Sequence, residues 1–154
     1  MEVHSEWYDN IAKEISLHKD RLSEKEYKKY KLDLLLRLAK RVAGFSSDCG
    51  ECQAFQGEFT KLTEDLGYLV QMSKEKRKSY FKAINNVIKH LRKYHKLISE
   101  EENRGHWIAI GAAIGVAIGA SLDNVGAGIA IGIGIGIAIG SYMDAKAKKE
   151  GKVI

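Results

Sequence analysis

The stretch "GIAIGIGIGIAIG", residues 128–140, decides the fold of this 154-residue chain. Isoleucine occupies every second position, and glycine or alanine occupies every position between. A looser form of the same rule runs through "IAIGAAIGVAIGA" at 108–120. Between Trp107 and Met143 the only charged residue is Asp123. Large and small apolar side chains are therefore sorted along a nearly uncharged segment.

Three structures could use this sorting. Strict alternation is formally a strand pattern, but a transmembrane barrel needs a polar inner face, and glycines weaken strands. A soluble helix has no polar face here, and its glycines cost roughly 1 kcal/mol each against alanine. In lipid, every unpaired backbone group costs several kcal/mol, so a helix forms despite glycine. The pattern favours transmembrane helices, with a strand or fibril and a buried soluble segment as the alternatives.

Two spans are predicted within a hairpin at 105–145, at 107–122 and 125–143, with Asp123 and Asn124 in the turn. Their helical lengths, roughly 24 Å and 28 Å, just cross a hydrocarbon core of about 30 Å. In such a hairpin Trp107 and Tyr142 lie at the same membrane interface, where aromatic side chains are enriched.

Basic residues lie near both ends of the predicted hairpin, including those of a basic C-terminal tail at 146–154. Because cytoplasmic flanks carry an excess of lysine and arginine, both termini are expected in the cytoplasm of a prokaryotic cell, with the hairpin in the inner membrane. The start of the chain lacks a secretory signal pattern, and two cysteines fit a reducing compartment.

Glycines recur at intervals of four in both spans, and such GxxxG steps let helix backbones approach closely. The helix-packing positions are Gly111, Gly115, Gly119, Gly128, Gly132, Gly136 and Gly140. Small residues also occupy the alternate positions of the second span, so they form two opposed flanks of its helix. One flank is expected to serve the hairpin partner, and the other predicts a homo-oligomer.

The segment "GAAIGVAIGASLDNVGAGIAIGIGIGIAIGSYMDAKAKKEG" resembles the two-helix glycine-zipper segments of small bacterial and archaeal membrane proteins. This resemblance implies a membrane location. The "GIGIGIG" core is also similar to the inner helices of ATP synthase c-rings. The second span lacks a carboxylate at mid-depth, so ion translocation by that mechanism is not expected.

The remaining residues, 1–104, predict a cytoplasmic bundle of four helices, so the whole chain is expected to be all-α. Apolar residues recur at helical spacing from Trp7 to Leu22, and "SEKE" at 23–26 is a capping box that opens a second helix, expected to end at Gly44. A third helix follows Cys52, and a fourth runs from Ser73 to Ile98.

One group of residues has metal-like spacing: Cys49 and Cys52 in "DCGEC", and His90 and His95 in "HLRKYH". Two thiolates and two imidazoles are a ligand set of structural zinc, which would join the third helix to the fourth. Two alternatives remain. In the first, the histidines, which are about 140° apart on a helix, are core residues without a metal. In the second, the cysteines form a redox pair.

The fourth helix carries an excess of basic residues, with Glu75 as its one acidic residue. This excess predicts a solvated helix face or contact with anionic membrane lipids. Nucleic-acid binding is a third interpretation, but no recognised binding motif accompanies the basic residues. The basic residues are Lys74, Lys76, Arg77, Lys78, Lys82, Lys89, Arg92, Lys93 and Lys96.

No set of catalytic residues with supporting partners is visible, and neither is a small-molecule substrate site, so a non-enzymatic protein is expected. The first hypothesis is a membrane protein that self-associates through its glycine-rich helices, as a scaffold, channel or membrane-remodelling unit. The alternative is a membrane-anchored regulatory module whose zinc-stapled, basic bundle binds a protein or nucleic acid.

Overall fold

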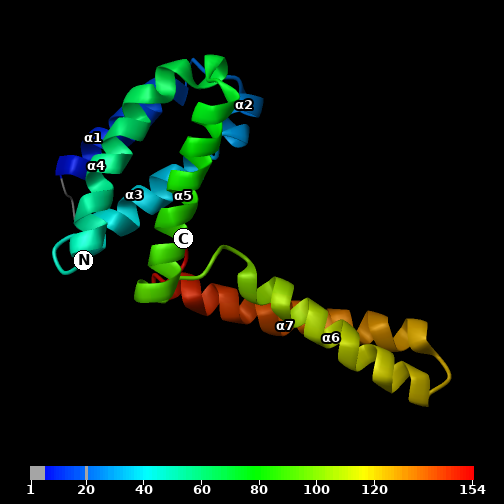
Figure 1. Ribbon diagram of the computed structural model, residues 1–154. Helices are drawn as coiled ribbons and strands as arrows, with labels where there is room; N and C mark the ends of the chain where they lie inside the picture. Colours follow the sequence, from blue (N-terminus) through cyan, green and yellow to red (C-terminus); the bar gives the residue numbers. More distant parts are fainter. Residues whose placement is uncertain (1–5, 20) are drawn as a thin grey trace. The chain divides into compact units, whose positions relative to one another are not determined.

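The computed structural model describes residues 6–19 and 21–154, and within them the protein is all-helical, with seven α-helices, one 3₁₀ helix and no strand (Figure 1). The elements are α1 (Glu6–Lys19), α2 (Glu24–Lys29), α3 (Leu32–Phe45), α4 (Gly50–Glu64), η1 (Asp65–Gln71), α5 (Lys74–His95), α6 (Glu102–Ser121) and α7 (Val125–Lys149). They form two compact units: unit 1 holds residues 1–95 with Ile154, and unit 2 holds residues 96–153.

Unit 1 has an apolar core built by α1, α3, α4 and α5. The spacing that predicted amphipathic helices places one stripe of each helix inside. The fully buried side chains include Ile15, Leu35, Leu38, Phe59, Ile84 and Leu91. Trp7 closes one side of this core, where its ring meets Phe59 edge-on at 6.0 Å and its Nε1 donates to Thr60 Oγ1 at 3.3 Å.

Over its described residues unit 1 contains five α-helices, because the single helix predicted from residue 23 is two helices. α2 ends at Lys29 with Tyr30 as its C-cap, and Lys31 adopts a left-handed conformation with φ of 54°. The break leaves the carbonyl oxygen of Tyr30 as the acceptor for the buried hydroxyl of Tyr80, at 2.9 Å. A buried hydroxyl without a partner is costly, so this tertiary contact outweighs the helical pattern.

The start of α2 is as predicted, whereas the end of α3 is not. Ser23 and Glu26 form the reciprocal capping box, with Glu26 N donating to Ser23 Oγ at 3.3 Å and Ser23 N to Glu26 Oε2 at 3.0 Å. Gly44 does not stop α3, which continues through Phe45. The turn after it brings Cys49 to the N-cap position of α4.

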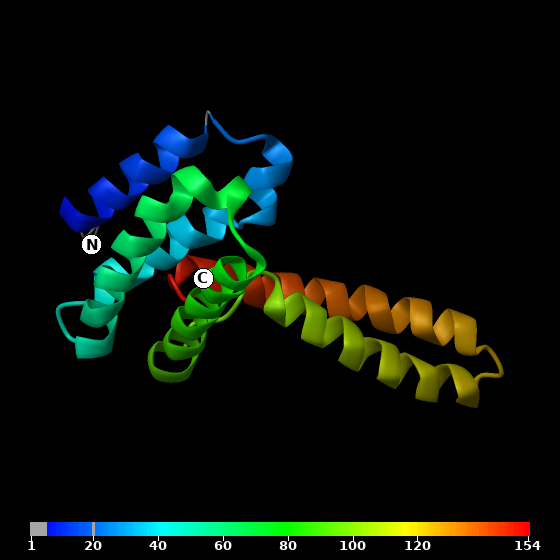
Figure 2. The ribbon, with the colours of Figure 1, turned by 45° about the horizontal axis from the view of Figure 1, so that its top comes forward.

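Unit 2 is an antiparallel hairpin in which α6 and α7 lie side by side along their lengths, joined by a short turn (Figure 2). Asp123 takes φ of 52° in the turn, and the Asn124 side chain accepts from Ala127 N at 3.1 Å to begin α7. Both helices extend past the predicted spans at the open end of the hairpin. α6 begins at Glu102, and α7 continues through Lys149 into the predicted tail.

Backbone hydrogen bonds join the two segments on either side of the hairpin, and we call this arrangement the clasp. After Gly151, whose φ is 68°, Lys152 N donates to Ala147 O at 2.9 Å. The Lys152 carbonyl then accepts from Ile98 N at 2.9 Å, and Ile98 forms a parallel β-bridge with Val153. The segment before α6 is thereby tied to the segment after α7.

Candidate functional site

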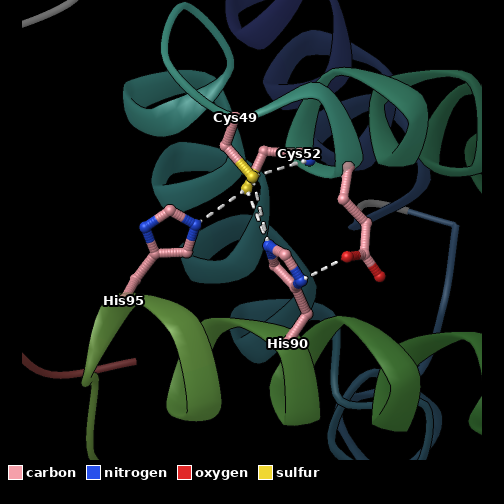
Figure 3. Close-up of polar contacts among 5 residues, drawn as sticks. Cys49, Cys52, His90 and His95 are labelled. Carbon is pink, nitrogen blue, oxygen red and sulfur yellow. Dashed lines mark hydrogen bonds and ion pairs between the residues drawn. The ribbon is translucent and has the colours of Figure 1, made fainter.

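Four side chains with metal-ligand chemistry converge in unit 1, and we call them the Cys–His cluster: Cys49, Cys52, His90 and His95 (Figure 3). Their ligand atoms all lie within 4.8 Å of one another. His90 Nε2 is 3.3 Å from Cys49 Sγ and 3.5 Å from Cys52 Sγ, while His95 Nε2 is 3.3 Å from Cys52 Sγ. The four residues predicted from spacing alone are brought together, and they could bind a metal.

Three of the four sulfur–nitrogen distances are close to those around a tetrahedral ion. With metal–sulfur bonds of about 2.3 Å and metal–nitrogen bonds of about 2.0–2.1 Å, a tetrahedral zinc site has sulfur–nitrogen edges of about 3.6 Å. The three sulfur–nitrogen distances, between 3.3 and 3.5 Å, are close to that edge. All four ligands come from protein side chains, which is the coordination typical of a structural site.

The helix ends explain how the cluster forms. Cys49 is the N-cap of α4, where its sulfur accepts a hydrogen bond from Cys52 N at 3.4 Å. His95 is the last residue of α5, and Lys96 turns out of the helix with φ of 56°. His90 and His95 therefore need not share a helical face, and their ring centroids are only 5.2 Å apart.

Neighbouring side chains fix the two imidazoles. The Phe45 ring stacks on His95 with a centroid distance of 3.9 Å, and Phe55 meets His90 edge-on at 5.4 Å. The carboxylate of Glu51 lies 2.9 Å from Nδ1 of His90, in contact but not aligned as a hydrogen bond. In a metal site a carboxylate at this position accepts a hydrogen bond from the outer nitrogen of the histidine, which fixes its tautomer and raises its basicity, and Glu51 is within reach of that role.

Sequence reasoning missed Glu51 and Phe45. Glu51 stands between the two cysteines in "CGEC", and its position there was the one available signal. Phe45 precedes the cysteine loop and carries no spacing signature, since only the tertiary fold places its ring on His95.

Burial sets the protonation states in the metal-free cluster. Burial, followed by the interaction with Cys49, raises the pKa of the Cys52 thiol to about 12. Burial, followed by the nearby His90, lowers the pKa of His95 below its ordinary value. The histidine is thus held in the neutral form that binds metals, and an arriving cation must displace the thiol proton.

In unit 2 the glycines predicted to pack helices lie between α6 and α7. All seven of these interhelical glycines, Gly111, Gly115, Gly119, Gly128, Gly132, Gly136 and Gly140, are buried. A Cβ on any of them would overlap backbone of the other helix or of the turn. On Gly128, for example, it would lie 2.6 Å from the Cα of Gly119. The backbones are therefore in direct contact along the hairpin.

Seven of the ten isoleucines of the hairpin are exposed, and the other three are half-buried. Ile114 and Ile118 on α6 are 55% and 53% exposed, and Ile131 and Ile135 on α7 are 64% and 56% exposed. This distribution is the reverse of a water-soluble pair of helices, in which large apolar side chains occupy the interface. It suits a solvent of lipid tails, where close backbone contact is the principal attraction between helices.

A second row of small residues, the outer small-residue row, faces away from α6. It comprises Gly126, Ala130, Gly134 and Ala138, all exposed. A Cβ on Gly134 would meet no atom within 4 Å. The two flanks expected from the alternation are thus both present, and one of them has no partner within the described chain.

The open end of the hairpin carries the predicted interface residues. Trp107 Nε1 contacts Met143 Sδ at 2.8 Å, so these two residues lie at one level, and the neighbouring Tyr142 is 71% exposed. Asp144, which sequence reasoning did not single out, accepts from the backbone nitrogens of Asn103 at 3.1 Å and Arg104 at 3.0 Å. α6 is therefore capped by a side chain from α7.

The predicted basic surface follows α5 and its end. Eight of its nine residues are exposed, namely Lys74, Lys76, Lys78, Lys82, Lys89, Arg92, Lys93 and Lys96. The ninth, Arg77, is half-buried and donates to Met72 O at 3.3 Å.

Comparison with known proteins relates the hairpin to a family of membrane proteins. Residues 99–146 match the family model described as glycine zipper membrane protein. The matched segment begins just before α6 and ends within α7, so the similarity to this family covers the hairpin. Among the described residues one helix, α7, is long and apolar enough to cross a membrane by length and composition. Searches of curated proteins and of solved structures gave no match, and the similarity to ATP synthase helices has no support there.

Proposed function

We propose that this chain is a non-enzymatic integral protein of the inner (cytoplasmic) membrane, whose α6–α7 hairpin spans the bilayer and self-associates. In this proposal both termini are cytoplasmic, and unit 1 is a cytoplasmic helical domain stabilised by zinc. The protein acts as a scaffold or membrane-remodelling unit built from copies of itself and membrane lipids.

The observation that carries the proposal is the inverted packing of the hairpin. Its seven interhelical glycines are buried while seven of its ten isoleucines are exposed, so in water a large apolar surface would remain unsatisfied. In lipid the same surface is favourable, and close backbone packing is retained. The family match over residues 99–146 agrees with this environment.

α6 is the shorter span. Its apolar part, residues 107–122, is preceded by His106 and Arg104, and it covers roughly 24 Å as a helix. Because α6 is packed along α7, the two are expected to insert together, with the bilayer thinning slightly around the shorter helix.

Self-association is proposed from the outer small-residue row. The interhelical glycines are already used between α6 and α7, so a second copy would pack against Gly126, Ala130, Gly134 and Ala138 instead. These residues recur at intervals of four on one exposed face, the spacing at which helices in lipid approach closely.

Zinc is the metal proposed for the Cys–His cluster. Two thiolates with two imidazoles at near-tetrahedral spacing suit a borderline-soft ion without a preferred geometry. Bound there, zinc would hold the start of α4 to the end of α5, while Glu51 and Phe45 hold the two imidazoles in place.

Labelling of single cysteines in intact cells tests the topology, in a Cys49→Ser/Cys52→Ser background. Asn124→Cys is expected to react with an impermeant maleimide from outside, whereas Lys148→Cys should react only after lysis. Labelling of Lys148→Cys alone from outside would invert the topology. Release of the protein from membranes by alkaline carbonate would contradict a hairpin that spans the bilayer.

The second candidate is a membrane-anchored regulatory module in which unit 1 binds a protein or nucleic acid. The exposed basic residues of α5 favour it. Salt-dependent binding of detergent-solubilised protein to RNA or DNA, lost on Lys78→Gln/Lys82→Gln, would favour this candidate over a scaffold.

A further inference from the structure

At the open end of the hairpin, unit 2 contains a hollow of about 360 Å³, which we call the basal hollow. Its walls come from the start of α6, the end of α7 and the two clasped chain segments. The residues used below are Lys96, Asn103, Met143, Lys146, Glu150 and Lys152. From this geometry we infer that the basal hollow binds a phosphate group, supplied by the head group of an anionic phospholipid.

Charge gives the first reason. Three lysines and one glutamate line the hollow, a net charge of +2. Glu150 contacts two of the lysines through different oxygens: Lys152 Nζ lies 2.7 Å from Oε2, and Lys146 Nζ lies 4.0 Å from Oε1. This carboxylate holds both ammonium groups at the rim. Lys96 makes no ion pair with any residue that the structure describes, so its charge is available to an anion.

The backbone at Lys96 gives the second reason. Lys96 takes φ of 56°, a conformation that glycine or asparagine adopts at lower cost than lysine. Local strain of this kind is often found at ligand-binding positions. Lys96→Gly would remove the positive charge and relieve the backbone strain together. Loss of binding without loss of stability would therefore indicate a binding role rather than a structural one.

Depth in the membrane gives the third reason, and it rests on the proposed function. Met143, the last large apolar residue of α7 at this end, forms one wall and contacts the interfacial Trp107. Lys146 follows three residues later, roughly 4.5 Å along the helix. The head-group layer on each side of a bilayer is about 5–7 Å thick, so the lysines stand at the depth of lipid phosphates. A bound lipid would lay its acyl chains along the exposed isoleucines.

The clasp gives the hollow a fixed shape. The hydrogen bonds of Lys152 with Ala147 and Ile98 hold the C-terminal wall, and Asp144 holds the start of α6. The basic rim is therefore built on ordered backbone rather than on a free tail. It is on this basis that the site is expected to bind one phosphate rather than to attract anions diffusely.

The test uses the full chain in maltoside micelles with Trp7→Phe, which leaves Trp107 as the remaining one of two tryptophans. Dioleoylphosphatidylglycerol is titrated into the micelles while Trp107 fluorescence is followed, and native mass spectrometry counts the lipids retained. Sodium phosphate is titrated in a parallel arm. We expect saturable binding of one phosphatidylglycerol per chain, and little effect of phosphate below millimolar concentrations.

The decisive variant is Lys96→Gly/Lys146→Gln. Its matched control is Lys31→Gly/Lys148→Gln, which also replaces one left-handed lysine and one lysine of the last turns of α7, outside the hollow. We expect binding to weaken at least tenfold in the first variant and less than twofold in the control, with equal melting temperatures. If the first variant melts lower, Lys152→Gln alone replaces it.

The outcomes separate the possibilities. Equal loss in both variants, or no saturable binding of either probe, overturns the site. Saturation by phosphate that excludes the lipid keeps the anion site and assigns it to free phosphate. If the site fails while the protein resists carbonate extraction, the spanning hairpin stands without it. Release by carbonate would instead count against the proposed function itself.

Discussion

Gly111 and Gly132 contact each other through their backbones: a Cβ on either residue would overlap the carbonyl oxygen of the other. The same reciprocity links Gly115 with Gly128 one turn further along. The hairpin thus has a close approach that no side chain larger than hydrogen can enter. Gly132 lies inside the hairpin and Gly134 lies on its outer face. Substitutions at these two glycines therefore distinguish packing within the hairpin from packing against a second copy.

We predict that Gly132→Ala destabilises the hairpin and that Gly134→Ala does not. The buried methyl must separate the backbones, at a cost of about 1–3 kcal/mol. Gly134 faces open space, and alanine there is expected to be neutral or better. Titration of mixed micelles with SDS, followed by Trp107 fluorescence, measures both. Equal midpoints for the two variants would contradict close backbone packing.

Self-association should depend on the outer small-residue row. Gly134→Leu adds apolar surface, which favours insertion, but it would hold a second copy away from the exposed face. Native mass spectrometry in mild detergent is expected to show smaller assemblies for Gly134→Leu. Ile135→Leu, on the same helix and of equal volume, should match the parent. A monomeric parent protein would remove the homo-oligomer from the proposal.

Asp144 is expected to hold the start of α6. Asp144→Ala leaves the backbone nitrogens of Asn103 and Arg104 without this acceptor, at a cost of about 1 kcal/mol, as for other N-terminal caps. Hydrogen–deuterium exchange should accelerate at residues 102–106 in this variant. Asp123→Asn, at the other end of the hairpin, serves as the control. Unchanged exchange at both sites would show that the cap is dispensable.

Zinc should bind at one ion per chain and stabilise unit 1. In a Trp107→Phe background, Trp7 reports the unit 1 core through its contact with Phe59. Chelation is expected to lower the Trp7 melting temperature by roughly 10 °C, since 1 kcal/mol corresponds to about 4–8 °C in a domain of this size. Cys52→Ser should melt like the chelated parent. Protein without stoichiometric metal, whose melting does not respond to chelation, would contradict the zinc proposal.

The metal-free protein should be most stable between about pH 6.5 and pH 9, the ordinary pKa values of histidine and cysteine. His95 has a lowered pKa in the fold, so the unfolded chain binds its proton first and stability falls as the pH drops below about 6.5. Cys52 has a raised pKa, so stability is lost as the pH rises from 9 towards 12.

Urea denaturation of chelated protein, followed at Trp7 across pH 5 to 10, measures this profile. His95→Gln should flatten the acidic flank, and Cys52→Ser should flatten the alkaline flank. A profile that neither variant alters would mean that the two groups titrate alike in the folded and unfolded chains.

Much of the architecture follows from the sequence alone. Helical spacing predicted the helices of unit 1, since apolar side chains every three or four residues can be buried together on one face only. The alternation of isoleucine with glycine predicted the hairpin and its membrane character, because residue volume and the lack of charge are local properties. The ligand types and their close pairs likewise identified Cys49, Cys52, His90 and His95 before their contacts were known.

Tertiary structure decided what depends on partners distant in the chain. The break at Tyr30 exists because the buried hydroxyl of Tyr80 needs an acceptor. Glu51 and Phe45 join the Cys–His cluster through a helix that begins 23 residues after Glu51, and Asp144 caps a helix that lies 40 residues earlier. The contact itself is tertiary: docking against α6 buries the all-glycine flank of α7, whereas the outer row, which includes Ala130 and Ala138, stays exposed.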